Sequence, residues 1–294
     1  PLKDRGKRGA QRIGVWLAQQ KMVPDLIVTS PAERALVTAQ KACKAMGNGA
    51  AGIQLDRRIY EAVVDDLLAV LGDCPQDAGR VMLVGHNPGL EHLLHWLAST
   101  TPETDDGKLL PTATLARLQM PADWGVLVAG CARLDAITRP GTLPKKFPYP
   151  APDGKEQRDR PAYYYTQSSV IPYRVRDGKP EILVIASSKK HHLVVPKGIK
   201  DPGLSPRESA AKEALEEAGI EGEVADTALG SYTCEKWGAT CTVSVYPMKV
   251  TRLIAEQDWE ESHRGREWVS PEKAARELKQ RELAPLVKQL EAMF

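Results

Sequence analysis

The first half of the chain alternates between two patterns of hydrophobic and polar residues. Residues 6–20 repeat apolar side chains at helical spacing, which predicts an amphipathic helix. The segments 25–30 and 81–86, DLIVTS and VMLVGH, each contain a short apolar run, which is typical of strands buried in a parallel sheet. Their alternation with helical segments predicts a three-layer α/β domain with a mainly parallel sheet.

Local signals predict where helices begin in this half. Ser30 is expected to cap a helix, with Pro31 in its first position and Glu33 in its third. Two further helices are expected, one over residues 61–72 and one that starts at Pro88.

The second half is richer in strands. Residues 163–175 and 181–187 flank a turn-forming cluster at 176–180, which predicts a β-hairpin. The other expected elements are strands at 193–195, near 229–236 and over 240–252, and helices from Pro206, over 271–279 and over 284–293. This mixture predicts an α+β domain.

Composition changes sharply between residues 137 and 162, where six prolines occur and apolar periodicity is lost. Such a stretch is typical of a linker stiffened by proline. The predicted division is a domain over 1–143, a linker over 144–162 and a domain over 163–294. A length of 294 residues agrees with two domains.

The charge is nearly balanced, with 40 basic and 38 acidic residues, which argues against a general nucleic-acid coat or a polybasic membrane anchor. No apolar run reaches the roughly 18 residues of a membrane span. The five cysteines are scattered and form no C-x-x-C pattern, so a cytoplasmic location is expected and no zinc site or disulfide framework is predicted. We therefore expect neither a nucleic-acid nor a membrane partner, and the oligomeric state stays open.

The segment 196–220 holds a compact acidic pattern. Glu213, Glu216 and Glu217 occupy positions i, i+3 and i+4 of a helix that is predicted to follow Ser205, so their carboxylates share one face. Acidic runs of this kind are usually solvated helix surface. Three carboxylates on one face are also what a hard cation such as Mg²⁺ requires.

The same residues resemble the Nudix box, the pattern G-x5-E-x7-R-E-U-x-E-E-x-G-U in which U is aliphatic. The match begins at Gly198 and keeps its spacing to Ile220. The resemblance implies an α+β Nudix domain, an α/β/α sandwich, that hydrolyses phosphorus-containing anhydrides. It also implies that Mg²⁺, or Mn²⁺, activates water at a diphosphate linkage. The implied metal-binding groups are the Gly198 carbonyl and the carboxylates of Glu213, Glu216 and Glu217.

Two positions depart from the box. Leu204 stands where the family has its first glutamate, and Lys212 stands where it has arginine. Because lysine lacks the planar fork of a guanidinium, we expect weaker support of Glu213. The three metal-binding glutamates are present, so activity is expected to be retained.

A basic stretch precedes the box. Residues 187–192 read SSKKHH, and Lys197 and Lys200 follow. The stretch is either a solvated loop or a clamp for phosphate beside the metal site. The predicted substrate-binding residues are Arg174, Ser188, Lys189, Lys190 and Lys197.

This stretch and the run DWEESHRGREW at 258–268 resemble the Nudix subgroup that cleaves diadenosine polyphosphates and diphosphoinositol polyphosphates. The resemblance implies a small-molecule polyphosphate substrate. A further metal-binding carboxylate is expected from Glu260, Glu261 or Glu267, and their positions do not distinguish them. Two other functions stay open: a non-catalytic regulator that binds phosphorylated ligands, and a hydrolase that removes oxidised nucleoside triphosphates.

Three short motifs stand out in the first half: Thr29–Ala35, Ile59–Glu61 and Val84–Pro88. Together they resemble the histidine phosphatase superfamily, in particular its short SixA-type phosphohistidine phosphatases. The resemblance covers most of residues 1–143 and implies that Arg34 and His86 bind a phosphoryl group, with Glu61 as proton donor. The alternative for a single histidine at a strand end is a structural role.

The nucleophile of that superfamily, a histidine in an R-H-G motif, has no counterpart in this chain. Residues 263–265 read His-Arg-Gly and lie in the other half. The family has its R-H-G strand upstream of a segment like residues 1–6, and this chain starts with Pro1 rather than Met. We therefore expect a domain that is N-terminally truncated, lacks a central strand and is inactive in this chain.

Overall fold

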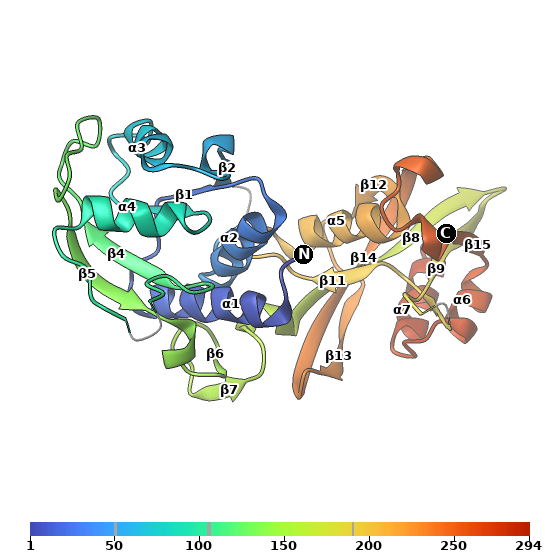
Figure 1. Ribbon diagram of the computed structural model, residues 1–294. Coiled ribbons are helices and arrows are strands. Elements are labelled where there is room, and N and C mark those ends of the chain that lie inside the picture. Colours follow the sequence, from blue (N-terminus) through green and yellow to red (C-terminus); the bar gives the residue numbers. More distant parts are fainter. Residues whose placement is uncertain (50–51, 105–106, 190) are drawn as a thin grey trace. The chain divides into compact units, whose positions relative to one another are not determined.

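The computed structural model describes residues 1–49, 52–104, 107–189 and 191–294 (Figure 1). The chain divides into two compact units, Pro1–Ala162 and Tyr163–Phe294. Each unit has hydrophobic clusters of its own and is described by itself.

Unit 1 is built on a three-stranded parallel sheet. Its strands are β1 (Leu26–Thr29), β2 (Ile53–Leu55) and β3 (Val81–Val84), in the order β2-β1-β3. Leu26 lies opposite Val81 and Thr29 lies opposite Val84, so the ends of β1 and β3 meet at one edge of the sheet. The prediction of a mainly parallel sheet is confirmed.

Helices cover both faces of this sheet (Figure 1). They are α1 (Asp4–Gln19), α2 (Glu33–Ala45), α3 (Val64–Gly72) and α4 (Gly89–Leu97). Ile27 of β1 packs with residues of α1 and α2, whereas its neighbour Val28 packs with residues of α3 and α4. Because successive side chains of a strand point to opposite faces, the two helix pairs form separate layers. The three-layer arrangement is therefore confirmed.

Two antiparallel hairpins also belong to unit 1. The first pairs β4 (Leu115–Gln119) with β5 (Arg133–Thr138), and the second pairs β6 (Phe147–Tyr149) with β7 (Glu156–Arg158). The unit also has two short 3₁₀ helices among its described residues, η2 (Arg57–Ile59) and η3 (Pro140–Thr142). The predicted linker over 144–162 thus carries the second hairpin. Arg8 of α1 donates a hydrogen bond of 2.9 Å to the carbonyl oxygen of Asp159, which ties this stretch to unit 1.

A cleft of about 710 Å³ is lined by both β3 and β4. Among the described residues, β3 pairs with β1 alone and β4 pairs with β5 alone. Met82 and Leu83 of β3 line the cleft, as do Leu115 and Leu118 of β4. Packed cores contain few voids larger than a water molecule, so this opening is exceptional.

Unit 2 contains a mixed sheet of eight strands, with the order β10-β9-β8-β14-β12 along its main path and with β11, β13 and β15 paired to β8, β14 and β9. The strands are β8 (Thr166–Arg176), β9 (Lys179–Ala186), β10 (Leu193–Val194), β11 (Lys197–Ile199), β12 (Ile220–Val224), β13 (Gly230–Lys236), β14 (Ala239–Leu253) and β15 (Arg266–Val269). β8 and β14 run parallel, and the other pairs are antiparallel.

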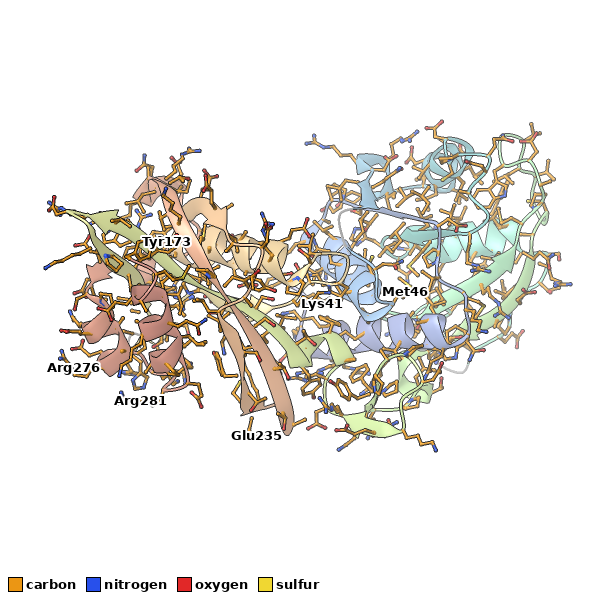
Figure 2. All side chains as sticks on the ribbon, turned by 180° about the vertical axis from the view of Figure 1, so that it is seen from behind. Lys41, Met46, Tyr173, Glu235, Arg276 and Arg281 are labelled. Carbon is orange, nitrogen blue, oxygen red and sulfur yellow. The ribbon has the colours of Figure 1, made fainter. Side chains whose placement is uncertain are left out.

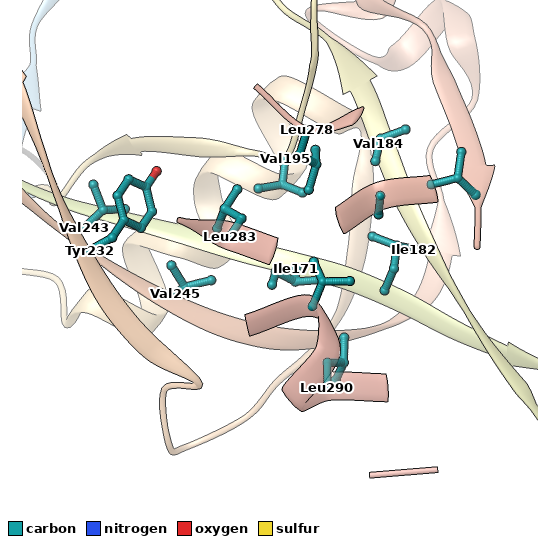
Figure 3. Packing of buried hydrophobic residues seen from close by; sticks show 13 residues of the cluster. Ile171, Ile182, Val184, Val195, Tyr232, Val243, Val245, Leu278, Leu283 and Leu290 are labelled. Atoms are coloured by element: carbon teal, nitrogen blue, oxygen red, sulfur yellow. The ribbon is translucent and has the colours of Figure 1, made fainter. Parts of the chain in front are cut away.

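Helices pack on both faces of this sheet. They are α5 (Pro206–Ala218), α6 (Pro271–Glu277) and α7 (Leu283–Glu291), with 3₁₀ turns η4 (Ala162–Tyr165), η5 (Glu256–Asp258) and η6 (Ser262–Arg264). Val170 of β8 packs with alanines of α5, and its neighbour Ile171 packs with Leu283 and Leu290 of α7 (Figure 3). The polar face of α6 turns outward, as Arg276 shows (Figure 2).

Most predicted elements of unit 2 are confirmed, including the β8–β9 hairpin and the helix that starts at Pro206. Three strands were not expected: β11, β12 and β15. Each has five residues or fewer, and the sequence of β12, IEGEV, contains a glycine and two glutamates, which strands disfavour. These segments form strands because they pair with longer strands of the sheet. A local sequence pattern does not reveal such pairing.

Two predicted helix starts in unit 1 are wrong. Helix α2 begins at Glu33 with Ala32 as its N-cap, because the Ser30 hydroxyl instead accepts a hydrogen bond from the Ala32 amide and closes a short turn. Helix α3 begins at Val64 rather than at residue 61. Glu61 has a φ of +52°, and this left-handed backbone cannot continue into a right-handed helix.

Candidate active site

Helix α5 presents the acidic residues, and local bonds define both of its ends. The Glu208 amide donates to Ser205 Oγ at 3.2 Å, and the Ser205 amide donates to Glu208 Oε2 at 2.7 Å. These two bonds form a capping box at the predicted start of the helix. Gly219 ends the helix at a φ of +59°, which glycine adopts without a steric penalty. The three acidic residues between these ends keep helical spacing and share one side of α5.

Glu213 lies directly against the backbone of Gly198 in β11. A Cβ atom on Gly198 would overlap the Glu213 carboxylate, so with any larger residue here that carboxylate would have to move. Burial raises the pKa of Glu213 from 4.5 to about 7, with the carboxylates of Glu217 and Glu216 as further causes. A carboxyl group in this state gains from a nearby positive charge, because the charge offsets both burial and repulsion.

Both carboxylate oxygens of Glu217 are held. Oε1 lies 2.7 Å from Nη1 of Arg264, whose side chain is only 6% exposed. Oε2 accepts a hydrogen bond of 2.9 Å from the backbone amide of Lys197 in β11. Two segments far from α5 in the sequence therefore set the orientation of this carboxylate.

Glu216 is paired with the lysine that replaces the arginine of the Nudix box. Lys212 Nζ lies 3.3 Å from Glu216 Oε1 and 2.9 Å from Asp201 Oδ2. Asp201 is in the loop between β11 and α5, and its amide donates to Ser209 Oγ at 3.1 Å. Lys212 therefore links α5 to the loop that precedes it.

Unit 1 brings three sequence-predicted motifs to the edge of its sheet where β1 and β3 end. His86 Nε2 lies 3.0 Å from Ser30 Oγ, and the ring of Tyr60 meets the imidazole edge-on at 5.7 Å between centroids. Burial lowers the pKa of His86, and the charge of Arg34 lowers it further. Glu61 follows Tyr60 in the turn before α3. Ser30, Arg34 and His86 thus lie close together at this edge.

Comparison with known proteins matches residues 165–290 to the model of the NUDIX domain. Nudix hydrolase 12, mitochondrial, of Arabidopsis thaliana is 30% identical over 142 residues, which cover 40% of this chain and 69% of that protein. The chain belongs to the Nudix hydrolase family. It is therefore a hydrolase of phosphorus-containing anhydrides, and the predicted enzyme class is confirmed.

Other relatives of this Nudix hydrolase are covered less completely. Nudix hydrolase 17, mitochondrial, of Arabidopsis thaliana is 37% identical over 110 residues, which are 34% of this chain and 59% of that protein. Diphosphoinositol polyphosphate phosphohydrolase 2 of Rattus norvegicus is 34% identical over 102 residues, which are 33% of this chain and 54% of that protein. The chain thus spans less than two thirds of these two proteins.

Residues 1–70 match the model of the histidine phosphatase superfamily, branch 1, so the resemblance stated for unit 1 is confirmed. Similar solved structures include Ap4A hydrolase of C. elegans, which is 26% identical. The match covers 44% of this chain and 97% of that chain, with a TM-score of 0.37. The protein histidine phosphatase SixA, with 17% identity, covers 48% of this chain and 85% of that chain at a TM-score of 0.41.

The donor groups of the Nudix unit suit a hard divalent cation. Three carboxylates of α5 and the Gly198 carbonyl are oxygen donors, and the glycine lets the backbone approach Glu213 closely. As the side chains stand, no three acidic, histidine or cysteine residues in the described part of the chain converge as a metal-binding group. Glu216 and Glu217 turn instead to Lys212 and Arg264. These oxygen donors fit the cation.

The predicted substrate-binding residues fall into three places. Ser188 and Lys189 are exposed in the loop between β9 and β10, whereas Lys190 lies outside the described residues. Lys197 is in β11, and burial lowers the pKa of its ammonium. Arg174 donates to Glu181 Oε2 at 2.6 Å, and its guanidinium lies 4.1 Å from the ring centre of Trp268. Among those of the five that the structure describes, Lys197 is the one hydrogen-bonded to the acidic helix, through its backbone amide and Glu217.

The three candidate carboxylates in the segment 258–268 lie in different surroundings. Glu261 lies 2.9 Å from Arg264 Nη1, so it shares this guanidinium with Glu217. Of the three candidates, Glu261 is therefore the one linked to the acidic face of α5. Glu267 pairs with Lys273 at 2.6 Å, and Glu260 is exposed. Sequence reasoning missed Arg264, although its place in a resembling segment that is rich in arginine was an available signal.

Proposed function

We propose that the Nudix unit hydrolyses a diphosphate linkage in a small-molecule polyphosphate with the help of Mg²⁺, for which Mn²⁺ can substitute. The observation that carries this proposal is the acidic face of α5, where Glu213 lies against the backbone of Gly198. The raised pKa of Glu213 supports it, since a carboxyl group pressed among carboxylates favours a bound cation.

The proposed roles follow from the positions of the groups. Glu213, Glu216, Glu217 and the Gly198 carbonyl hold the cation, which when bound polarises the phosphoryl oxygens and makes water more acidic. Lys212 and Arg264 orient the carboxylates of Glu216 and Glu217. The exposed basic loop between β9 and β10 binds the phosphates of the substrate.

For the substrate we propose a dinucleoside polyphosphate or a diphosphoinositol polyphosphate. The rat relative is a diphosphoinositol polyphosphate phosphohydrolase by name, which supports the second compound. Several lysines and histidines in one loop suit a ligand with many phosphates better than one with few. Phosphate release should be measured with both compounds and with an oxidised nucleoside triphosphate, and the fastest turnover on the last would overturn this assignment.

The metal-dependent mechanism is tested by Glu216→Gln. This substitution keeps the size of the side chain and removes one negative oxygen donor, so metal-dependent hydrolysis should fall to background. Glu223→Gln is the matched control, because Glu223 is an exposed glutamate on β12. Unchanged turnover in Glu216→Gln would refute the mechanism, and binding of polyphosphate without any product in the wild type would favour a regulator.

For unit 1 we propose a site that binds a phosphorylated ligand without transferring its phosphoryl group. Ser30, Arg34 and His86 cluster at the sheet edge, whereas the chain has no R-H-G motif. Inorganic phosphate should perturb the imidazole resonances of His86 in the full chain, and Arg34→Ala should abolish the effect. Arg133→Ala, on an exposed arginine, is the control. Release of phosphate from a phosphohistidine peptide by the Glu216→Gln protein would contradict the proposed inactivity.

We propose a cytoplasmic location. All five cysteines are free thiols, and among the described helices none combines the length and the apolar character needed to cross a membrane. Several plant relatives are described by name as mitochondrial. Fluorescence imaging of the tagged full chain tests the proposal, and accumulation in an organelle would contradict it.

A further inference from the structure

The segment between β14 and α6 clamps the C-terminal end of helix α5. Trp259 is only 5% exposed and packs over Gly219, where any Cβ atom would crowd the indole. Its Nε1 donates a hydrogen bond of 3.1 Å to the carbonyl oxygen of Glu216. Arg266 donates to the carbonyl oxygens of Gly219 at 2.8 Å and Ile254 at 2.9 Å. The bonds to Glu216 and Gly219 thus reach carbonyls at the C-terminal end of α5, where carbonyls lack helical partners.

Arg264 extends this clamp from the backbone of α5 to one of its carboxylates. Its Nη1 lies 2.7 Å from Glu217 Oε1 and 2.9 Å from Glu261 Oε2. Its Nε donates to the carbonyl oxygen of Ala186 at the end of β9, at 2.9 Å. The guanidinium is therefore anchored to the sheet on one side while it contacts α5 on the other.

The burial of Arg264 makes this contact specific. Its side chain is 6% exposed, so its charge depends on the two carboxylates and the carbonyl rather than on water. One guanidinium faces the carboxylates of Glu217 and Glu261, so the group keeps a net negative charge. A cluster of this kind still attracts a cation, and the second oxygen of Glu217 is fixed by the Lys197 amide at 2.9 Å.

The lysine of the Nudix box makes different contacts. Lys212 reaches Asp201 and Glu216. The guanidinium that touches Glu217 comes instead from η6, after β14 in the sequence. We propose that Arg264 is a positioning residue that orients Glu217 for divalent-cation binding, an inference that rests on the proposed function of α5.

The proposal predicts a graded response to substitution. Arg264→Met removes the charge and all three bonds, so Glu217 and Glu261 repel each other without compensation. Residues that support metal ligands typically change metal affinity by about 10- to 100-fold when they are altered. Arg264→Lys keeps the charge but lacks the planar fork, so it should restore part of the affinity.

The test measures Mn²⁺ binding to the full chain from the electron paramagnetic resonance signal of free Mn²⁺. The Mn²⁺ dissociation constant should rise about tenfold or more in Arg264→Met and by a smaller factor in Arg264→Lys. The Mg²⁺ concentration for half-maximal hydrolysis should rise in parallel. Arg252→Lys is the control, because Arg252 also pairs with a glutamate but is 68% exposed, and its Mn²⁺ affinity should not change.

The outcomes separate the two proposals. If Arg264→Met binds Mn²⁺ as tightly as the wild type, the positioning role is refuted while the function of α5 stands. If Arg264→Met does not fold, as judged by circular dichroism, Arg264→Lys decides, and wild-type affinity in that variant refutes the role. If the wild type itself neither binds Mn²⁺ nor hydrolyses any polyphosphate, the proposed function fails first.

Discussion

Replacing Glu213 with glutamine should change how the stability of the metal-free protein depends on pH. Burial, together with the nearby carboxylates of Glu217 and Glu216, raises the pKa of Glu213 from 4.5 to about 7. The folded state therefore holds the proton more tightly than the unfolded state does. The resulting stabilisation is fully present below pH 4.5 and is lost as the pH rises through about 7.

The size of the effect follows from the two pKa values. One pKa unit corresponds to about 1.4 kcal/mol, so the difference between 4.5 and about 7 amounts to about 3 kcal/mol. Between pH 5 and pH 8 the wild type should lose about 2.5 kcal/mol through this group. Glutamine at position 213 does not titrate, so Glu213→Gln should lack this loss.

The assay is urea unfolding of the full chain in the presence of EDTA, at pH 5 and at pH 8. The free energy of unfolding is measured for the wild type and for Glu213→Gln. The comparison uses the unfolding transition whose midpoint differs between the two proteins. Glu223→Gln, on an exposed strand position, removes the same charge without touching α5. If the wild type and Glu213→Gln depend on pH in the same way, the account of a buried acid among acids is wrong.

Two further substitutions test the packing around α5. Gly198→Ala places a Cβ in the space of the Glu213 carboxylate, so it should cost about 1–3 kcal/mol of stability and weaken Mn²⁺ binding. An unchanged melting temperature would contradict this. The control is Gly141→Ala, where a Cβ meets open space. Trp259→Phe removes the indole N–H that donates to the Glu216 carbonyl, so it should lower stability by about 1 kcal/mol in urea unfolding. Equal midpoints for this variant and the wild type would show that water replaces the bond at no cost.

Much of the fold was predictable because its signals are local. The start of α5 after Ser205 was predicted, and the capping box there and the glycine at position 219 are local signals for its two ends. The parallel pairing of β1 with β3 followed from two short apolar runs. The cap assigned to Ser30 failed because its hydroxyl is engaged in a turn and with His86, which lies far along the chain.

Within the candidate site the same limit applies. The shared face of the three α5 glutamates follows from helical spacing alone, and the place of Gly198 in the motif implied a role beside them. The partners of these groups were not predictable. Lys212 pairs with Asp201, and Glu217 pairs with Arg264. No periodic pattern in the sequence links the two residues of either pair.

The sequence by itself determined the family, the acidic helix and its ends, because these depend on residues within a few turns of one another. Only the tertiary structure decided which charges face the carboxylates. The pairing of β8 with β9, β11 and β14 brings the ends of distant strands to α5, and with them the Lys197 amide and the Arg264 guanidinium. A bond between residues so far apart depends on the packed sheet, since the unfolded chain has no local preference that would form it.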